Sequence, residues 1–100
     1  MTTRITSEQL RGIFPALATP VTADGQIDTQ AVRALLDHLQ GSGISGTVPL
    51  GGTGEYGALS RNERARMVAA VREHQAADLP VLAGVLDPGY YDAIASGQAL

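Results

Sequence analysis

The feature that most constrains this chain is a regular alternation of short apolar segments with longer segments of helical period. Three apolar segments bounded by Gly or Pro are too short for a helix and are predicted as buried strands: residues 12–20, 46–50 and 80–85. They are apolar throughout instead of alternating apolar and polar, which is typical of strands buried on both faces. A helical pattern follows each of them. This order predicts an α/β fold with a parallel βα repeat.

Local signals place the first two helices. Asp28 is a candidate N-cap for a helix that ends at Gly41 and whose apolar positions follow the i, i+3, i+4, i+7 rule: Val32, Leu35, Leu36 and Leu39. Ser60 and Glu63 form a capping box, in which the hydroxyl and the carboxylate each satisfy one amide of the first turn. The second helix is therefore expected from Ser60 to about Ala77.

The third helical segment follows a turn at 87–89 and is expected over 90–100, where Tyr90 and Tyr91 are interpreted as packing at the helix start. Two architectures fit the whole pattern, an open doubly wound sheet and a (β/α)8 barrel. The chain has 100 residues, whereas an eight-unit barrel needs roughly 200 or more. Three units would make less than half of a barrel.

Composition excludes several classes of function. Seven basic residues against ten acidic ones give a net charge of −3, which argues against a nucleic-acid partner. Cysteine is absent, which excludes disulfide scaffolds and thiol nucleophiles. No apolar run is long enough to span a membrane and no signal core follows the polar N-terminus, so a cytoplasmic protein without a membrane partner is expected. All seven basic residues are Arg, so any lysine chemistry must come from elsewhere.

The most unusual segment is the glycine-rich loop 51–57, after the second predicted strand. Residues 52–57 match the dinucleotide pattern G-x-G-x-x-G, so a small nucleotide- or phosphate-binding α/β module is one hypothesis. Residues 41–46 match it as well, and the helix after the loop begins three residues beyond Gly57, so the pattern is weakly specific. A second hypothesis is a seat for a small carboxylate, made by backbone amides and the Thr53 hydroxyl. A third is a tight turn that Glu55 holds by accepting amides.

The remaining polar residues favour ordinary structural roles. His38 and His74 each stand alone near a helix end without a second ligand at i+3 or i+4, so no metal site is predicted. The Arg cluster on the second helix is interpreted as a solvated outer surface interrupted by an acid: Arg61, Arg64 and Arg66.

Several motifs occur in an order and spacing that resemble the opening of the dihydrodipicolinate synthase and N-acetylneuraminate lyase family: Thr19-Pro20, residues 24–28, 51–55, 59–64 and 80–84. The resemblance implies a (β/α)8 barrel of which this chain forms roughly the first three units, with residues 1–11 as a leader and 12–100 as a domain incomplete at its C-terminus. It also implies a homotetramer and a class I aldolase-type lyase. Such an enzyme binds pyruvate or another 2-keto acid as a Schiff base on lysine, for aldol cleavage, condensation or dehydration, without a cofactor.

The same resemblance assigns the substrate-binding residues. Thr53 matches the carboxylate-binding Thr of the family, while Gly52 stands where a second hydroxyl residue is usual and can offer only its amide. This Gly-Gly-Thr-Gly-Glu version resembles the branch that dehydrates 5-dehydro-4-deoxyglucarate. The lysine and its partner tyrosine lie on later strands, so no catalytic residue is expected in this chain.

The chain alone is therefore expected to be inactive. A further hypothesis is a non-catalytic remnant that acts only through association. Three parallel strands with open edges bury little core, so the isolated chain is expected to be poorly stable or to self-associate.

Overall fold

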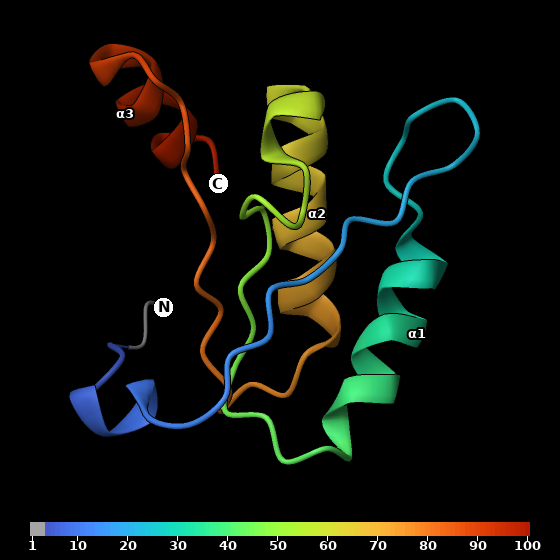
Figure 1. Ribbon diagram of the computed structural model, residues 1–100, viewed down its shortest axis with the longest axis vertical. Coiled ribbons are helices and arrows are strands. Elements are labelled where there is room, and N and C mark those ends of the chain that lie inside the picture. The colour runs from blue at the N-terminus through green and yellow to red at the C-terminus, as the bar shows by residue number, and fades with distance from the viewer. Residues whose placement is uncertain (1–3) are drawn as a thin grey trace.

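Helices and extended segments alternate along the chain in the computed structural model, which describes residues 4–100 (Figure 1). The first three residues of the predicted leader lie outside the described residues. The helical elements are, in order, η1 Ser7–Leu10, α1 Thr29–Gln40, η2 Tyr56–Ala58, α2 Arg61–His74 and α3 Tyr90–Gln98.

The helices begin where the capping signals predict. The Asp28 side chain accepts a hydrogen bond from the Ala31 amide at 3.1 Å, and the Ser60 hydroxyl accepts one from the Glu63 amide at 3.2 Å. The end of α1 before Gly41 is also confirmed. The structure places the ends of α2 and α3 two to three residues earlier than the predictions, at His74 and Gln98.

The three predicted strands are not confirmed in the part of the chain that the structure describes, where the extended segments are joined by isolated bridges and single backbone hydrogen bonds. Ala16 forms a parallel bridge with Val48, and Thr47 forms one with Val81. The middle segment, residues 46–50, therefore lies between the other two. The parallel direction agrees with the prediction, but residues 4–100 contain no continuous strand.

Prolines account for the interruption, because proline has no N–H to donate. At the first bridge the Leu17 amide donates to the Val48 carbonyl and the Val48 amide donates to the Pro15 carbonyl, at 3.0 and 2.9 Å. Extending this ladder toward the N-terminus would require the nitrogen of Pro15 to donate. Extending the ladder between Thr47 and Val81 would likewise require the nitrogen of Pro49 or Pro80 to donate.

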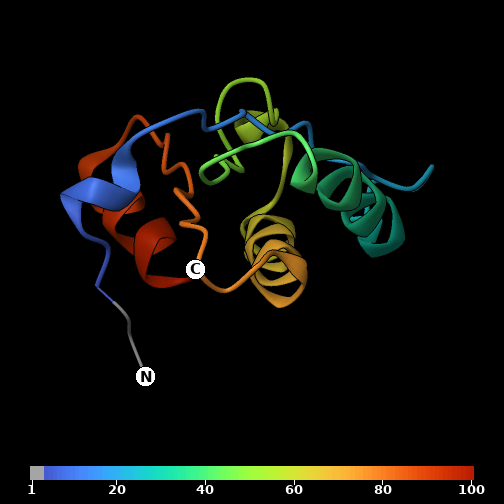
Figure 2. The same ribbon diagram turned by 90° about the horizontal axis from the view of Figure 1, so that it is seen from below.

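The core lies between the extended segments and one pair of helices. Figures 1 and 2 show α1 and α2 side by side on one side of the segments, with α2 between α1 and α3. The apolar positions of α1 predicted from their spacing face this core, with Val32 and Leu36 fully buried. The main buried side chains from the other elements are Leu17, Leu50, Met67, Val68 and Val71.

A buried polar network fixes the end of α2. The Thr47 hydroxyl donates to Gln75 Oε1 at 2.6 Å, and Gln75 Nε2 donates to the carbonyls of Leu79 and Pro80 at 3.0 and 3.1 Å. Gln75 has extended backbone, with ψ at 147°, so its side chain turns inward where the helix was predicted to continue. The network joins α2 to the middle and third segments.

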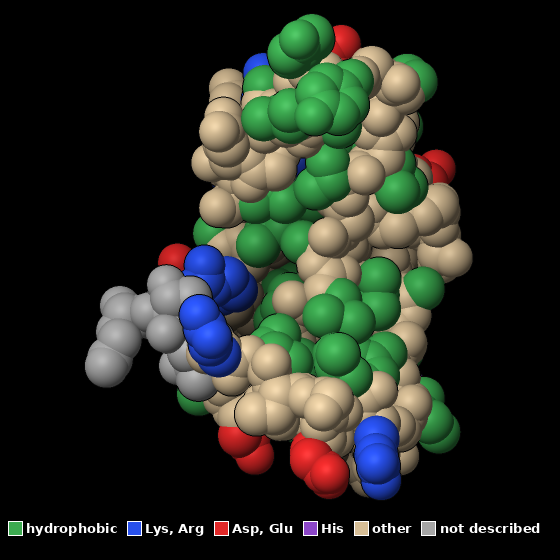
Figure 3. Space-filling view, turned by 90° about the vertical axis from the view of Figure 1, so that its left-hand side faces the viewer, with side chains coloured by type: hydrophobic (Ala, Val, Ile, Leu, Met, Phe, Trp, Pro, Cys, Tyr) green, Lys and Arg blue, Asp and Glu red, His purple; other side chains and the backbone are tan. Residues whose placement is uncertain are grey.

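The face that carries α3 and the third segment exposes apolar side chains (Figure 3). Tyr90 and Tyr91 are 76% and 82% exposed, which corrects the prediction that they pack at the helix start. Their rings instead contact each other edge to face, with centroids 5.3 Å apart. The other exposed apolar residues of this region are Val85, Leu86, Ile94 and Leu100. Among the described residues, no helix combines the length and apolar character needed to cross a membrane.

Candidate functional site

Two residues of the glycine-rich loop region have left-handed backbone, one directly before the loop and one near its end. Leu50 has φ 64° and Glu55 has φ 57°, a conformation that residues with a Cβ adopt rarely. Between them, the Glu55 amide donates to the Gly52 carbonyl at 3.0 Å and the Tyr56 amide donates to the Gly51 carbonyl at 3.4 Å. The loop is therefore a compact turn that ends in η2, before α2.

Gly52 and Thr53 lie exposed at the tip of this turn. In the described part of the chain, neither amide donates a hydrogen bond to another residue, and the Thr53 hydroxyl forms none. A Cβ added at Gly52 would meet no atom within 4 Å. Within the described residues, the tip thus holds two amides and one hydroxyl without a hydrogen-bond partner, a combination suited to a small anion.

The underside of the loop is fixed to the first extended segment. The buried Thr19 hydroxyl donates to the Gly54 carbonyl at 2.6 Å. A Cβ at Gly54 would lie 3.0 Å from the Leu17 carbonyl oxygen and 3.1 Å from the Leu50 nitrogen, so a side chain there would be crowded. This contact gives Thr19 of the Thr19-Pro20 motif a structural role.

Arg64 fixes the end of the loop, which corrects the prediction that it lies on a solvated surface. Its Nε donates to the Tyr56 carbonyl at 3.1 Å, and its guanidinium carbon lies 3.8 Å from the centre of the Tyr56 ring. Its terminal nitrogen forms an ion pair with Asp87 at 3.3 Å. The Arg64 side chain is only 14% exposed. Its ion-pair partner lies 23 residues further along the chain, so no local signal could have revealed the contact.

Asp87 joins this group to α3. It accepts a hydrogen bond from the Ser96 hydroxyl, which is the main reason that the pKa of the Asp87 carboxyl lies below its ordinary value. Smaller contributions come from Tyr56, Arg64 and Arg61, and burial opposes them. The Tyr56 hydroxyl contributes to this shift, yet it is buried and has no hydrogen bond of normal geometry among the described residues.

Two acidic residues have different roles from those predicted. Glu55 is exposed and accepts no amide in the described part of the chain, so it does not hold the loop. Glu63 does not complete the capping box: its Oε2 accepts from the Ile27 amide at 2.8 Å, 36 residues earlier, and its Oε1 pairs with Arg66 at 3.2 Å. Thr19 and Arg64, rather than Glu55, hold the loop.

Among the described residues, no group of three His, Cys, Asp or Glu side chains could hold a metal ion. His74 Nε2 lies 2.7 Å from Asp37 Oδ1 and so links α2 to α1, while His38 is exposed. A neutral or a protonated imidazole can form the link to Asp37.

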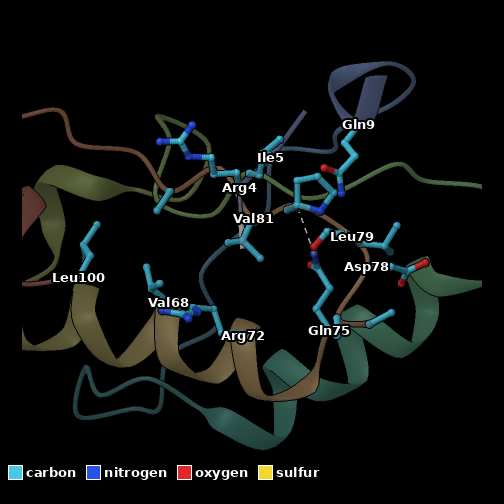
Figure 4. A pocket seen from close by; sticks show the side chains of 14 residues that line it. Arg4, Ile5, Gln9, Val68, Arg72, Gln75, Asp78, Leu79, Val81 and Leu100 are labelled. Atoms are coloured by element: carbon cyan, nitrogen blue, oxygen red, sulfur yellow. Dashed lines mark hydrogen bonds between the residues drawn. The ribbon is translucent and has the colours of Figure 1, made fainter. Parts of the chain in front are cut away.

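A hollow beside α2 lies away from the glycine-rich loop (Figure 4). It has a volume of about 520 Å³ and lies between the N-terminal segment, α2 and the third extended segment. Its labelled polar lining residues include Arg4, Gln9 and Arg72, and no residue of 51–58 lines it. The hollow and the exposed tip are therefore separate features.

Nearly the whole chain is similar in sequence to known proteins. The Dihydrodipicolinate synthetase family model matches residues 9–100. The 4-hydroxy-tetrahydrodipicolinate synthase of Haloarcula marismortui is 40% identical over 80 residues, which cover 80% of this chain and 26% of that protein. The enzyme of the same name from Neisseria meningitidis serogroup B is 39% identical over 90 residues, covering 90% of this chain and 31% of the relative. The chain thus spans about a quarter to a third of the length of the curated relatives it matches.

The chain is also similar in fold to solved structures. YagE of E. coli K12, a prophage protein of the dihydrodipicolinic acid synthase family determined in complex with pyruvate, is 34% identical with a TM-score of 0.81, covering 88% of this chain and 30% of that chain. A catalytic lysine mutant of the Ruminococcus gnavus sialic acid aldolase has a TM-score of 0.84 at 22% identity, covering 94% of this chain and 31% of that chain. The second likeness concerns the fold alone.

Proposed function

This chain belongs to the Dihydrodipicolinate synthetase family, whose members include lyases, and from that premise we propose that it supplies the carboxylate-binding loop of a lyase acting on pyruvate or another 2-keto acid. The lyase would form a Schiff base between its substrate and a lysine. This chain has no lysine, so the amine would come from another part of the complete protein.

The observation that carries the proposal is the tip of the glycine-rich loop. Gly52 and Thr53 are exposed, and within the described residues their amides donate to no other residue. Thr19 and Arg64 hold the same turn from two sides, so the tip is fixed before any ligand arrives. A fixed set of donors binds an anion without first having to be ordered.

The proposed chemistry follows from where a keto acid would lie on this tip. Its carboxylate would accept hydrogen bonds from the two amides and the Thr53 hydroxyl, which orients the neighbouring C2 carbonyl. The lysine amine would add to C2, and loss of water from the adduct would leave a protonated imine. That imine withdraws electrons from C3, so a bond at C3 can break or form.

Gly52 bears on the type of reaction. It has no hydroxyl, so a proton relay through a side chain at this position is absent. The sequence Gly-Gly-Thr-Gly-Glu resembles the dehydratase branch, so dehydration and aldol chemistry are both proposed for the complete protein.

The architecture that we propose is the first three βα units of a (β/α)8 barrel. Two parallel bridges and the TM-scores against much longer relatives support it. The remaining units would pair with the open edges of the outer segments. Assembly as a tetramer in the cytoplasm stays a prediction.

Nucleotide binding by the loop is not favoured. In proteins that bind phosphate at a glycine-rich loop, the amides at the start of the following helix point at the anion. Here η2 separates the loop from α2, and the Ser60 hydroxyl already accepts from the Glu63 amide of that helix.

The test is to trap the Schiff base in the complete protein that carries this chain. Treatment with pyruvate and borohydride is expected to add one reduced pyruvate to a lysine and to abolish activity, whereas borohydride alone leaves the protein unchanged. Pyruvate should also raise the melting temperature and NAD should not, because only a ligand of the folded state stabilises it. Failure to trap pyruvate, together with stabilisation by NAD, would contradict the proposal.

A further inference from the structure

We propose that Arg64 is a positioning residue for keto-acid binding: it keeps the glycine-rich loop in the shape that presents Gly52 and Thr53, although it does not touch the substrate itself. This inference rests on the proposed function. It adds a residue on α2 to a site otherwise built from the loop.

Arg64 holds Tyr56 by two independent contacts. The Nε group donates to the Tyr56 carbonyl at 3.1 Å, and the guanidinium carbon lies over the Tyr56 ring, 3.8 Å from its centre. The Tyr56 ring is buried in the core, with 4% of the residue exposed. Both the backbone and the side chain of Tyr56 are therefore fixed relative to α2.

The charge of Arg64 is matched within the same cluster. A cation that is only 14% exposed requires a partner, and Asp87, itself 13% exposed, provides one at 3.3 Å. The Ser96 hydroxyl donates to the other oxygen of Asp87 and so fixes that carboxylate against α3. Arg64 thus ties together α2, the end of the glycine-rich loop and the start of α3.

The connection from Tyr56 to the tip is short. The Tyr56 amide donates to the Gly51 carbonyl, and the Glu55 amide donates to the Gly52 carbonyl, so the position of Tyr56 sets the closure of the turn. Thr19 holds the other side through the Gly54 carbonyl. Loss of Arg64 would remove both of its contacts with Tyr56, leaving the buried ring and the Thr19 hydrogen bond to hold the turn, and the amides at the tip would sample more orientations.

Three variants of the complete protein test this inference. Arg64→Ala removes every contact of the side chain, and Arg64→Lys keeps a positive charge near Asp87 but cannot reproduce the planar contact with Tyr56. Arg72→Ala is the matched control, because Arg72 is an exposed arginine on the same helix. The measurements are kcat and KM for the keto acid and hydrogen exchange at the amides of residues 52–56.

We expect Arg64→Ala to raise KM about 10- to 100-fold, with a much smaller change in kcat, because misplaced donors weaken the capture of the carboxylate. Exchange at residues 52–56 should accelerate, while exchange in the core of α1 stays as in the wild type. Arg64→Lys should give a smaller rise in KM, and Arg72→Ala should match the wild type in both measurements.

An unchanged KM together with unchanged exchange at residues 52–56 in Arg64→Ala would overturn the inference. If Arg64→Ala does not fold, Arg64→Lys decides in the same way: a raised KM at an unchanged melting temperature supports the inference, and a wild-type KM overturns it. Failure of wild-type protein to trap pyruvate, together with stabilisation by NAD, would instead refute the proposed function, and exchange at residues 52–56 would still show whether Arg64 fixes the loop.

Discussion

Thr53 is the only side chain at the tip of the glycine-rich loop that can donate a hydrogen bond to a carboxylate. It is exposed, and its hydroxyl has no partner in the described part of the chain. Its role in the site therefore depends on a single O–H group, which a substitution can remove without disturbing the core.

Thr53→Val should raise KM for the keto acid about 10- to 100-fold, because a hydrogen bond to a charged group contributes about 1.5–3 kcal/mol. Thr53→Ser keeps the hydroxyl and should stay near the wild type. Steady-state kinetics on the complete protein measures both variants. Equal KM values for Val and Ser at this position would show that the hydroxyl does not bind substrate.

Asp87 should make stability depend on pH in the acid range. Its folded-state pKa lies below the ordinary value of 3.8, mainly because of the hydrogen bond from Ser96. A lowered pKa means that the ionised form is favoured by folding, so this contribution is present above pH 3.8 and is lost as pH falls through the folded-state value.

Ser96→Ala should therefore raise the pKa of Asp87 toward 3.8 and reduce the part of the acid destabilisation that this group causes. Carboxyl titration by NMR reads the pKa directly, and unfolding at pH 3 and pH 7 gives the stability. An Asp87 midpoint that does not move in Ser96→Ala would contradict the assignment of Ser96 as the main cause.

At the scale of elements, local signals predicted the helix starts and missed contacts between distant segments. Asp28 and Ser60 cap their helices as expected, because a cap joins residues three positions apart. Glu63 was assigned to the same local box, but it reaches the Ile27 amide, and Arg64 was assigned to the surface, but it reaches Asp87. Such partners depend on the tertiary fold, which the spacing of residues along one helix does not encode.

Local sequence signals also did not predict how the extended segments pair. Their apolar composition indicated buried, parallel segments, and the bridges have that direction. Continuous pairing depends on which nitrogen atoms face the neighbouring segment. Three of these positions are proline, at residues 15, 49 and 80, so proline limits the pairing on both ladders. The role of Gly52 and Thr53 in binding stays a prediction, and their exposure depends on the tertiary fold.

A pair of glycine substitutions tests how closely the third segment approaches the loop. A Cβ at Gly84 would lie 2.2 Å from the Leu50 carbonyl oxygen, whereas a Cβ at Gly52 would meet nothing within 4 Å. Gly84→Ala should therefore destabilise the complete protein by about 1–3 kcal/mol, as overpacking commonly does. Gly52→Ala should leave stability nearly unchanged. Urea unfolding of both variants measures the difference, and equal midpoints would refute the close approach.

For the whole molecule, the arrangement of the extended segments leaves apolar surface and edges uncovered. Among the described residues, the first and third segments pair only with the middle one. Apolar side chains are exposed on the face that carries α3 (Figure 3), and α3 itself exposes Tyr90, Tyr91 and Ile94. Exposed edges and apolar patches of this kind promote association.

The isolated 100-residue chain should therefore associate or melt without a sharp transition. Sedimentation velocity and a thermal melt followed by circular dichroism measure this directly. A monomer with a cooperative melt would contradict this prediction and would favour a self-sufficient domain.

The most direct test of the central claim is a crystal structure of the complete protein after pyruvate has been trapped with borohydride. The account predicts that the pyruvate carboxylate lies within hydrogen-bond distance of the Gly52 and Thr53 amides and the Thr53 hydroxyl, with C2 bonded to a lysine. A carboxylate held by other residues, with the tip of the glycine-rich loop facing only solvent, would contradict it.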